Sequence, residues 1–519
     1  MSLTREQKRA FRSLLFKHQD GLAITATIAV LEKHSVFDFL AAEHGTSITA
    51  ILKKFPQFHS GYLNVSLRSL ASQGILKYTV TTEEIQIETT EKFNNFLPHI
   101  SHYENLNTLF SYYYELLKQP YQFPLPKIDI LISMATYWSI TKQALKADTY
   151  FQEEVALHLE GVLLAPLLVY LGYHADLETI ETATFLKDAS LLKVLQLLEL
   201  HDGSSLTTKG SFLFAKSYAY GVTASYMPIM CHIESYLTGD FLSFFQQDRL
   251  GNEQHVFRGI NVWGSGGSHA TYFNKFDAVL VDIFNKPLSE QPKGIIDVGC
   301  GNGALLEHIF DLIWNKTQRK DDLSANKLIL IGADYNKEAL LSTKRNLKKA
   351  NVWAEVVWGD IGNPAEIDQK LQELYNVKLD ELLNVRSFLD HNRPFNEPSG
   401  VYTGNLLSSG AFAHRGKQLH NSAVAQSLIE HFQKWKPYIS THGLLFIELH
   451  TVAPNTVALN LGKTPCTAYD VTHGFSDQYI VELDVFLDAI NKAGITIDPM
   501  HSYRFPSEEI STISINLIQ

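Results

Sequence analysis

Apolar runs and amphipathic stretches alternate along the second half of the chain, a pattern typical of an α/β domain. The amphipathic stretches at residues 304–310 and 337–351 show helical periodicity. Runs that are apolar throughout predict strands covered on both faces, as in parallel sheets flanked by helices. Strands are predicted over residues 294–298, 327–333, 354–357, 379–388 and 443–447, and two more, 499–505 and 512–518, near the end. We therefore expect a Rossmann-like α/β domain in residues 275–519.

The first 274 residues show mainly helical patterns. Amphipathic helices are predicted over residues 23–39, 47–55 and 60–74. Residues 75–80 and 85–89 alternate between apolar and polar positions, which is typical of two half-buried strands. Three helices followed by a two-stranded wing predict a winged-helix-like domain in residues 1–100.

A similar pattern returns later in the chain. Residues 20–40 (DGLAITATIAVLEKHSVFDFL) are echoed by 160–180 (EGVLLAPLLVYLGYHADLETI), and residues 88–97 (ETTEKFNNFL) by 206–215 (LTTKGSFLFA). Such self-similarity indicates a duplicated structural unit. We expect residues 101–274 to form a helical lid that contains a second winged-helix-like repeat.

Charge narrows the partners of this helical region. The 519 residues carry a formal net charge of -11, which disfavours a nucleic-acid binder. The third helix of the first unit offers only Arg68, and the second unit offers Lys187 and Lys193. These are too few cations for a face that contacts phosphates. The charge pattern therefore argues against DNA as the partner of this region.

Cysteine usage and the N-terminus suggest the compartment. Cys231, Cys300 and Cys466 show no metal-binding or disulfide spacing, which is typical of a reducing compartment. The first residues, MSLTREQKRAF, are polar and charged and do not form a signal peptide. No apolar run is expected to span a membrane. The sequence thus predicts a cytoplasmic protein without a membrane partner.

The most specific motif is the loop after the first predicted strand, where Asp297, Gly299, Gly301 and Gly303 stand at alternate positions. Glycines permit a tight turn and a close approach of a ligand to the backbone. The spacing D-x-G-x-G-x-G differs from the G-x-G-x-x-G of dinucleotide-binding proteins. It resembles motif I of the class I S-adenosylmethionine-dependent methyltransferases. The resemblance implies a seven-strand sheet with an antiparallel last strand, and a glycine loop that passes under the methionine part of the cofactor. Many similar small-molecule methyltransferases use a winged-helix-like region for dimerisation or to wall the substrate site, so the resemblance also implies a homodimer or such a wall here.

The ends of the next two strands carry residues suited to the rest of this cofactor. Asp334 follows the second strand, where a carboxylate can bind a ribose diol through two charge-assisted hydrogen bonds, and Tyr335 comes next. Asp360 and Ile361 follow the third strand. In the methyltransferase family, an acidic residue at this place meets the adenine amino group. These four residues are therefore expected to contact the cofactor.

A glycine-rich, polar segment precedes the cofactor domain. Residues 261–273 read NVWGSGGSHATYF. One interpretation is a simple linker. The other is a segment that closes over the cofactor, with Ser265, His269 and Tyr272 near the ligand. The sequence leaves both open.

Three polar clusters are expected at one edge of the sheet, because ligands of an open parallel sheet bind at the carboxyl ends of its strands. Residues 390–395 (DHNRPF) follow the fourth strand, residues 448–451 (ELHT) follow the fifth, and residues 469–479 (YDVTHGFSDQY) come later. One interpretation is acid-base catalysis by a histidine. The other is a mixed nitrogen and oxygen site for a divalent metal such as Fe(II) or Mn(II).

Four longer motifs resemble one group of polyketide synthase C-methyltransferase domains that includes the metal-dependent, apratoxin-type enzymes. They are VRSFLDHNRPF, AQSLIEHFQKW, GLLFIELHTV and THGFSDQY. The resemblance implies His450 and Gln478 as metal ligands. It makes His391 a base, a third ligand or a residue behind the ligands, and it makes Arg393 and His473 further catalytic candidates. Gln426, Glu430 and His431 are reserve candidates.

The expected function is S-adenosylmethionine-dependent C-methylation of a malonyl-type thioester or a related activated acid, assisted by a metal. The acyl substrate is expected on a carrier protein, on coenzyme A or as a free small molecule. A malonyl α-proton is too weakly acidic to be lost unaided at neutral pH, and a chelated cation would stabilise the enolate. One alternative is an O-methyltransferase with a histidine base. Another is a regulator or scaffold that binds S-adenosylmethionine without turnover.

Overall fold

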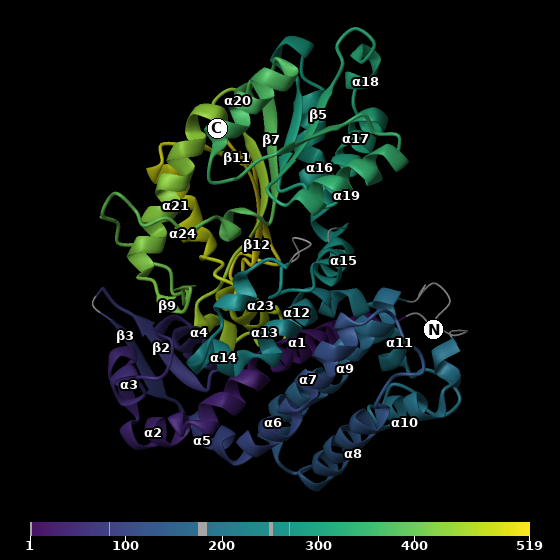
Figure 1. Cartoon of the computed structure of the whole chain (residues 1–519), viewed down its shortest axis with the longest axis vertical. Helices are drawn as coiled ribbons and strands as arrows, with labels where there is room; N and C mark the ends of the chain where they lie inside the picture. The colour runs from purple at the N-terminus through teal and green to yellow at the C-terminus, as the bar shows by residue number, and fades with distance from the viewer. Residues whose placement is uncertain (1–2, 83, 175–183, 249–252, 269) are drawn as a thin grey trace.

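The computed structural model describes residues 3–82, 84–174, 184–248, 253–268 and 270–519. Figure 1 shows two parts. A layer of helices built from the first half of the chain lies below, and a sheet with helices on both faces, built from the second half, stands on it. Helix α1 (Arg5–Lys33) runs along the boundary between them.

The second half forms the predicted sheet. It has seven strands in the order β11-β12-β10-β7-β4-β5-β6. All adjacent pairs from β10 to β6 are parallel, and β12 runs antiparallel to both β10 and β11. The strands are β4 (Gly294–Val298), β5 (Ile329–Asp334), β6 (Glu355–Trp358), β7 (Leu382–Ser387), β10 (Leu444–Leu449), β11 (Ile497–Phe505) and β12 (Ile513–Ile518). The expected fold class is confirmed, including the antiparallel last strand.

Helices cover the sheet on both faces, and each face has its own apolar core. One core contains side chains of α20, α21 and α24, and the other contains side chains of α16, α17 and α19. The elements of this half also include α15 (Arg258–Ser268), α16 (Ala270–Phe284), α17 (Ala304–Lys316), α18 (Arg319–Asp322), α19 (Lys337–Lys349), α20 (Pro364–Tyr375), β8 (Ala413–His414), β9 (Lys417–Gln418), α21 (Asn421–Trp435), α22 (Pro454–Ala458), α23 (Cys466–Gly474) and α24 (Leu483–Lys492).

The segment expected to be a linker or a closing loop is helical. Residues 258–268 form α15, which packs against α12. Gly221 and Gly264 permit this contact, because a Cβ on Gly221 would stand 2.6 Å from the Gly264 Cα. The glycines of this segment therefore serve close helix packing as well as chain flexibility. His269 lies outside the described residues.

The first half is helical with one small sheet. Its elements include α1 (Arg5–Lys33), α2 (Val36–Glu43), β1 (Gly45–Ser47), α3 (Ile48–Lys54), α4 (Ser60–Ser72), β2 (Leu76–Val80), β3 (Ile85–Thr89), α5 (Glu91–Phe96), α6 (Ile100–Asn107), α7 (Leu109–Lys118), α8 (Ile128–Ala144), α9 (Ala156–His174), α10 (Ala189–Leu197), α11 (Thr208–Ala215), α12 (Gly221–Ser225), α13 (Met227–Cys231) and α14 (Ile233–Thr238). The strands β2 and β3 pair antiparallel as the predicted wing, and β1 adds to β3.

The first helix differs from the prediction at both ends. It begins at Arg5 rather than at residue 23, because Thr4 and Gln7 form a capping box. It ends at Lys33 because Ser35 adopts a left-handed backbone with φ of 56°. Residues 18–31 are buried on every side. The expectation of an amphipathic helix over residues 23–39 was therefore wrong, since this helix is enclosed by the fold.

Equivalent contacts occur in the two predicted repeats. The ammonium of Lys92 donates to the carbonyl of Gln73 at 2.8 Å, and that of Lys209 donates to the carbonyl of Leu198 at 3.3 Å. Both acceptors terminate the third helix of their unit. The second unit has an isolated bridge between residues 201 and 206 in place of a wing. These parallels are consistent with a duplicated unit whose second wing is reduced.

Helices α1 and α9 cross in close contact at the centre of the first half. A Cβ on Gly21 would stand 2.2 Å from the His158 Cα, and a Cβ on Gly161 would stand 2.3 Å from the His18 carbonyl oxygen. Residues 151–174, which contain α9, are long and apolar enough to cross a membrane, contrary to our expectation, but 94% of the most apolar window is buried inside the fold. This segment is the core helix of the first half.

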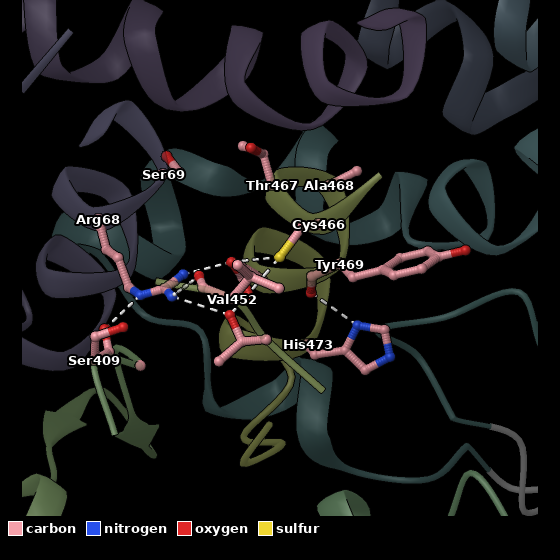
Figure 2. A network of polar contacts seen from close by, with 12 residues as sticks. Arg68, Ser69, Ser409, Val452, Cys466, Thr467, Ala468, Tyr469 and His473 are labelled. Atoms are coloured by element: carbon pink, nitrogen blue, oxygen red, sulfur yellow. Dashed lines mark hydrogen bonds and ion pairs between the residues drawn. The ribbon is translucent and has the colours of Figure 1, made fainter. Parts of the chain in front are cut away.

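A buried arginine joins the two halves. Arg68 of α4 is 2% exposed. Its guanidinium forms an ion pair with Asp470 of α23 and donates to the carbonyls of Ser409 at 2.6 Å and Val452 at 3.0 Å and to the Thr451 hydroxyl at 2.9 Å (Figure 2). The residue that the sequence offered for DNA contact therefore faces the half that contains the seven-strand sheet.

We expect Arg68→Met to lower the free energy of unfolding by about 3–5 kcal/mol, because Asp470 would remain buried without its counter-ion. Urea denaturation followed by circular dichroism measures the loss. The matched control is Lys77→Met on β2. The Lys77 side chain is 51% exposed in its pair with Glu88, so this variant should lower the free energy of unfolding by less than about 1 kcal/mol. Equal losses in the two variants would contradict a special role for Arg68.

Candidate functional site

The glycine loop after β4 forms an open cradle. Gly299, Gly301 and Gly303 all adopt positive φ values, of 85°, 55° and 84°, which favour glycine. A Cβ on Gly301 would meet nothing within 4 Å, whereas one on Gly303 would stand 2.9 Å from the Thr343 Cγ2. The loop thus turns tightly against α19 and leaves free space beside Gly301.

Two carboxylates stand next to this cradle. Asp297 is 1% exposed, and its Oδ1 has no hydrogen-bond partner among the described residues. Burial and the charge of Asp334 raise the pKa of Asp297 to about 7. Asp334 accepts from the amides of Gly301 at 3.1 Å and Asn336 at 2.8 Å. A buried acceptor beside open space fits the amino group of S-adenosylmethionine, and Asp334 at its strand end fits the ribose hydroxyls.

The next strand ends supply surfaces suited to an adenine ring. Tyr335 is 56% exposed at the end of β5. Asp360 follows β6 and accepts from the amide of Gly362 at 2.7 Å. Ile361 is 7% exposed, and its carbonyl accepts from the indole of Trp435 at 2.8 Å. An exposed aromatic ring, a carboxylate and a fixed apolar side chain thus lie at neighbouring strand ends.

Tyr272 packs against Phe505 and against the same apolar core as Tyr469 of α23. Its ring packs edge-on against Phe505, with centroids 5.3 Å apart. Its hydroxyl contributes to raising the pKa of Tyr469 on α23. Burial raises the pKa of Tyr272, and the charge of Arg12 opposes this rise. The predicted cofactor residue therefore stands on the side of the site that α23 forms.

A histidine and a glutamate pair at the ends of the central strands. His391 lies in a short turn after β7, and Glu448 lies in β10, which runs parallel to β7. The Nδ1 of His391 is 2.5 Å from the Glu448 Oε1. Glu448 also accepts from the amides of Asp390 and Leu449, each at 2.7 Å. A carboxylate held in this way fixes the proton on Nδ1 and leaves the Nε2 lone pair of His391 free to act as a base.

His473 stands beside this pair. The His391 and His473 rings meet edge-on with centroids 5.3 Å apart. The Nδ1 of His473 is 2.8 Å from the carbonyl of Tyr469 (Figure 2), so this nitrogen donates and Nε2 is an acceptor. Burial, together with His391, lowers the pKa of His473 to about 3. His473 is therefore neutral at physiological pH.

A small cavity next to His473 joins the two halves of the chain. Its lining includes Arg68, Asp470, His473, Gln478 and Phe412. The Gln478 amide donates to the Tyr226 hydroxyl at 3.2 Å. The Tyr226 ring lies 5.7 Å from that of His473. The helical first half of the chain thus supplies Tyr226 to the wall of the site.

The two predicted metal ligands do not form a ligand set. The Nε2 of His450 is 2.8 Å from the Ser514 hydroxyl, and its Nδ1 is 3.3 Å from the Val481 carbonyl. Burial lowers the pKa of His450 to about 3. Within the described ranges, no three His, Cys, Asp or Glu side chains converge as metal ligands. The residues present therefore do not fit the predicted metal.

Arg393 supports the loop that carries His391. It is 3% exposed and donates to the carbonyls of Asp390 at 3.1 Å and Val424 at 3.3 Å. Burial lowers the pKa of Arg393 to about 10. Its charge faces backbone oxygens and the Tyr479 ring, 5.7 Å away. Its contacts are those of a loop anchor.

The three reserve candidates, Gln426, Glu430 and His431, are not part of the His391–Glu448 pair. His431 contacts Asp390 at 2.9 Å, and Gln426 and Glu430 bond to each other at 3.1 Å on α21. Sequence reasoning placed Glu448 in a polar cluster at the expected site but assigned no role to Glu448 or to Tyr226. A charged residue near the end of an otherwise apolar strand was the available signal for Glu448. Tyr226 had no comparable signal, because many tyrosines surround it in the sequence.

Three family models match the chain. They describe an AprA N-terminal domain over residues 11–78, an AprA winged helix domain over residues 160–240 and an AprA MT2-like domain over residues 253–516. No curated protein sequence matches.

Solved structures with similar folds include methyltransferases. The citrinin polyketide synthase CMeT domain is 12% identical, with 75% of this chain and 95% of that chain covered and a TM-score of 0.36. The CurJ carbon methyltransferase is 13% identical, with 80% and 98% covered and a TM-score of 0.33. The mitomycin 7-O-methyltransferase MmcR is 10% identical, with 96% and 94% covered and a TM-score of 0.31.

The MT2-like match spans just over half of the 519 residues and contains the glycine loop, both carboxylates beside it and the histidine–glutamate pair. The protein is an S-adenosylmethionine-dependent methyltransferase, and it belongs to the AprA MT2-like family.

Proposed function

We propose that this methyltransferase methylates the α-carbon of an activated acyl group, such as a malonyl-type thioester, with His391 as the general base. The observation that carries the proposal is the hydrogen bond of 2.5 Å between the His391 Nδ1 and Glu448. It occupies Nδ1 and leaves the Nε2 lone pair to take the proton. A weakly acidic C–H bond needs a base that is held in place and whose protonated form is stabilised.

The proton transfer balances on the residues of this chain. The Nε2 of His391 takes the α-proton, and the C–H electrons pass into the carbonyl to form an enolate. Glu448 stabilises the imidazolium that results, because its carboxylate contacts the His391 Nδ1 and is held by two backbone amides. After methylation, His391 releases the proton to solvent. The glycine loop, Asp297 and Asp334 would hold S-adenosylmethionine, whose electrophilic methyl group would form the new bond to the α-carbon as its bond to sulfur breaks.

Neutral donors are available for the enolate oxygen. Gln478 lines the cavity beside His473, and one of its amide hydrogens is directed at Tyr226. Its other amide hydrogen is suited to the developing oxyanion. No step is assigned to a metal, because the nitrogens of His450 face Ser514 and Val481.

The same pair would also deprotonate a hydroxyl group, so O-methylation is the competing reaction. A phenol is much more acidic than the α-carbon of a thioester and demands less of its base. The enclosed, carboxylate-supported His391 favours the more demanding carbon acid. Nuclear magnetic resonance of the product formed from malonyl-N-acetylcysteamine distinguishes a C-methyl group from a methyl ester.

We expect His391→Ala to reduce methyl transfer by about 10²–10⁴-fold, since a positioned general base contributes this much. Glu448→Gln should also slow turnover, because an amide does not stabilise an imidazolium. Both variants should bind S-adenosylmethionine as the parent does in calorimetry. His420→Gln is the matched control, because His420 is an exposed histidine at the start of α21. Full activity of His391→Ala would disprove its role as the base.

We expect Asp334→Ala to weaken binding of S-adenosylmethionine by about 10- to 100-fold, which corresponds to about 1.5–3 kcal/mol for a hydrogen bond to a charged group. Isothermal titration calorimetry gives the affinity. Asp311→Ala, at an exposed position on α17, should bind as the parent does. Unchanged affinity of Asp334→Ala would place the ribose elsewhere.

A further inference from the structure

Four cations line one face of the first turns of α1. Arg5, Lys8, Arg9 and Arg12 are spaced i, i+3, i+4 and i+7, so they project from one side of the helix. All four are exposed, and in the part of the chain that the structure describes none of them forms an ion pair. We name these four residues the cationic stripe. The stripe reverses the local sign of charge on a protein whose net charge is -11.

The helix that carries the stripe is held firmly on another side. The ring of Phe11 packs on Phe212 of α11, with centroids 5.4 Å apart, and Leu15 is 4% exposed. Ser13 touches the loop after α22, where a Cβ on Gly462 would stand 2.2 Å from the Ser13 hydroxyl oxygen. The stripe is therefore presented by a fixed helix at the junction of the two halves (Figure 1).

Neighbouring side chains connect the stripe with the site. Ser13, the neighbour of Arg12, touches Gly462 in the loop between α22 and α23. Helix α23 carries Tyr469 and His473. The Tyr469 ring lies 5.9 Å from that of His473, which meets His391. A partner bound at the stripe would therefore lie close to the substrate cleft.

We propose that the cationic stripe docks an acidic carrier protein that presents the acyl substrate on its flexible prosthetic arm. This proposal rests on the proposed function, because only a tethered acyl group requires such a partner. Complementary charge steers association and sets orientation, and salt screens it. A membrane is a poorer partner, because described residues 3–33 contain no exposed large hydrophobic side chain with which a basic helix could enter lipid.

The test uses the full-length protein and an acidic acyl carrier protein loaded with malonyl. The variant R5E/K8E/R9E reverses three charges of the stripe and leaves Arg12 in place. The matched control, K316E/K348E/K349E, reverses three exposed lysines on α17 and α19. Fluorescence anisotropy measures binding of the labelled carrier at about 50 mM and about 500 mM salt. Methylation of the carrier-bound substrate is compared with that of malonyl-N-acetylcysteamine.

We expect R5E/K8E/R9E to bind the carrier at least about 10-fold more weakly than the parent at low salt. The parent should itself lose affinity at high salt. The KM for carrier-bound substrate should rise to a similar degree, whereas kinetics with malonyl-N-acetylcysteamine and binding of S-adenosylmethionine should not change. The control variant should resemble the parent in every measurement.

Equal carrier affinity in the parent and R5E/K8E/R9E would overturn the docking proposal, and so would an equal loss in the control. Stripe-dependent binding to anionic phospholipid vesicles, without binding to the carrier, would replace it by a membrane contact. If the parent methylates neither thioester but binds the carrier through the stripe, the proposed reaction fails and the docking surface stands.

Discussion

The guanidinium of Arg68 is the contact on which the relation between the two halves depends. A charge enclosed between domains is tolerated only when it is paired and its donors are satisfied. Arg68 meets this demand with Asp470 and with three oxygen acceptors from the methyl-transfer half. Asp470 lies one helical turn before His473 on α23. The orientation of the winged helix and the position of a site histidine are therefore set by the same ion pair.

Further polar contacts hold the same helix from the same direction. Gln73 donates to the Thr467 hydroxyl at 2.7 Å, and Asp20 accepts from the amide of Ala468 at 3.2 Å. These contacts come from α1 and from the end of α4, both in the first half of the chain. The first half of the chain is therefore part of the active site. It positions α23, and it contributes Tyr226 directly.

Three buried histidines show how surroundings decide chemistry. The Nδ1 of His391 contacts the Glu448 carboxylate, which leaves Nε2 to accept a proton. His473 has a carbonyl behind it and is a neutral acceptor at physiological pH. Both nitrogens of His450 are occupied, and its ring packs on Phe486 with centroids 5.2 Å apart. The three residues are alike in sequence and differ only in what the fold places beside each.

The sequence by itself determined the sheet and the cofactor loop, because both depend on local patterns. An apolar run specifies a strand covered on both faces, and alternate glycines specify a turn that other residues resist. The tertiary structure alone decided the site. The role of Glu448 depends on β10 lying beside β7, and Tyr226 reaches the cleft from 252 residues before Gln478. Likewise, α1 was misjudged because its enclosure depends on α9 and α23, which its own periodicity does not encode.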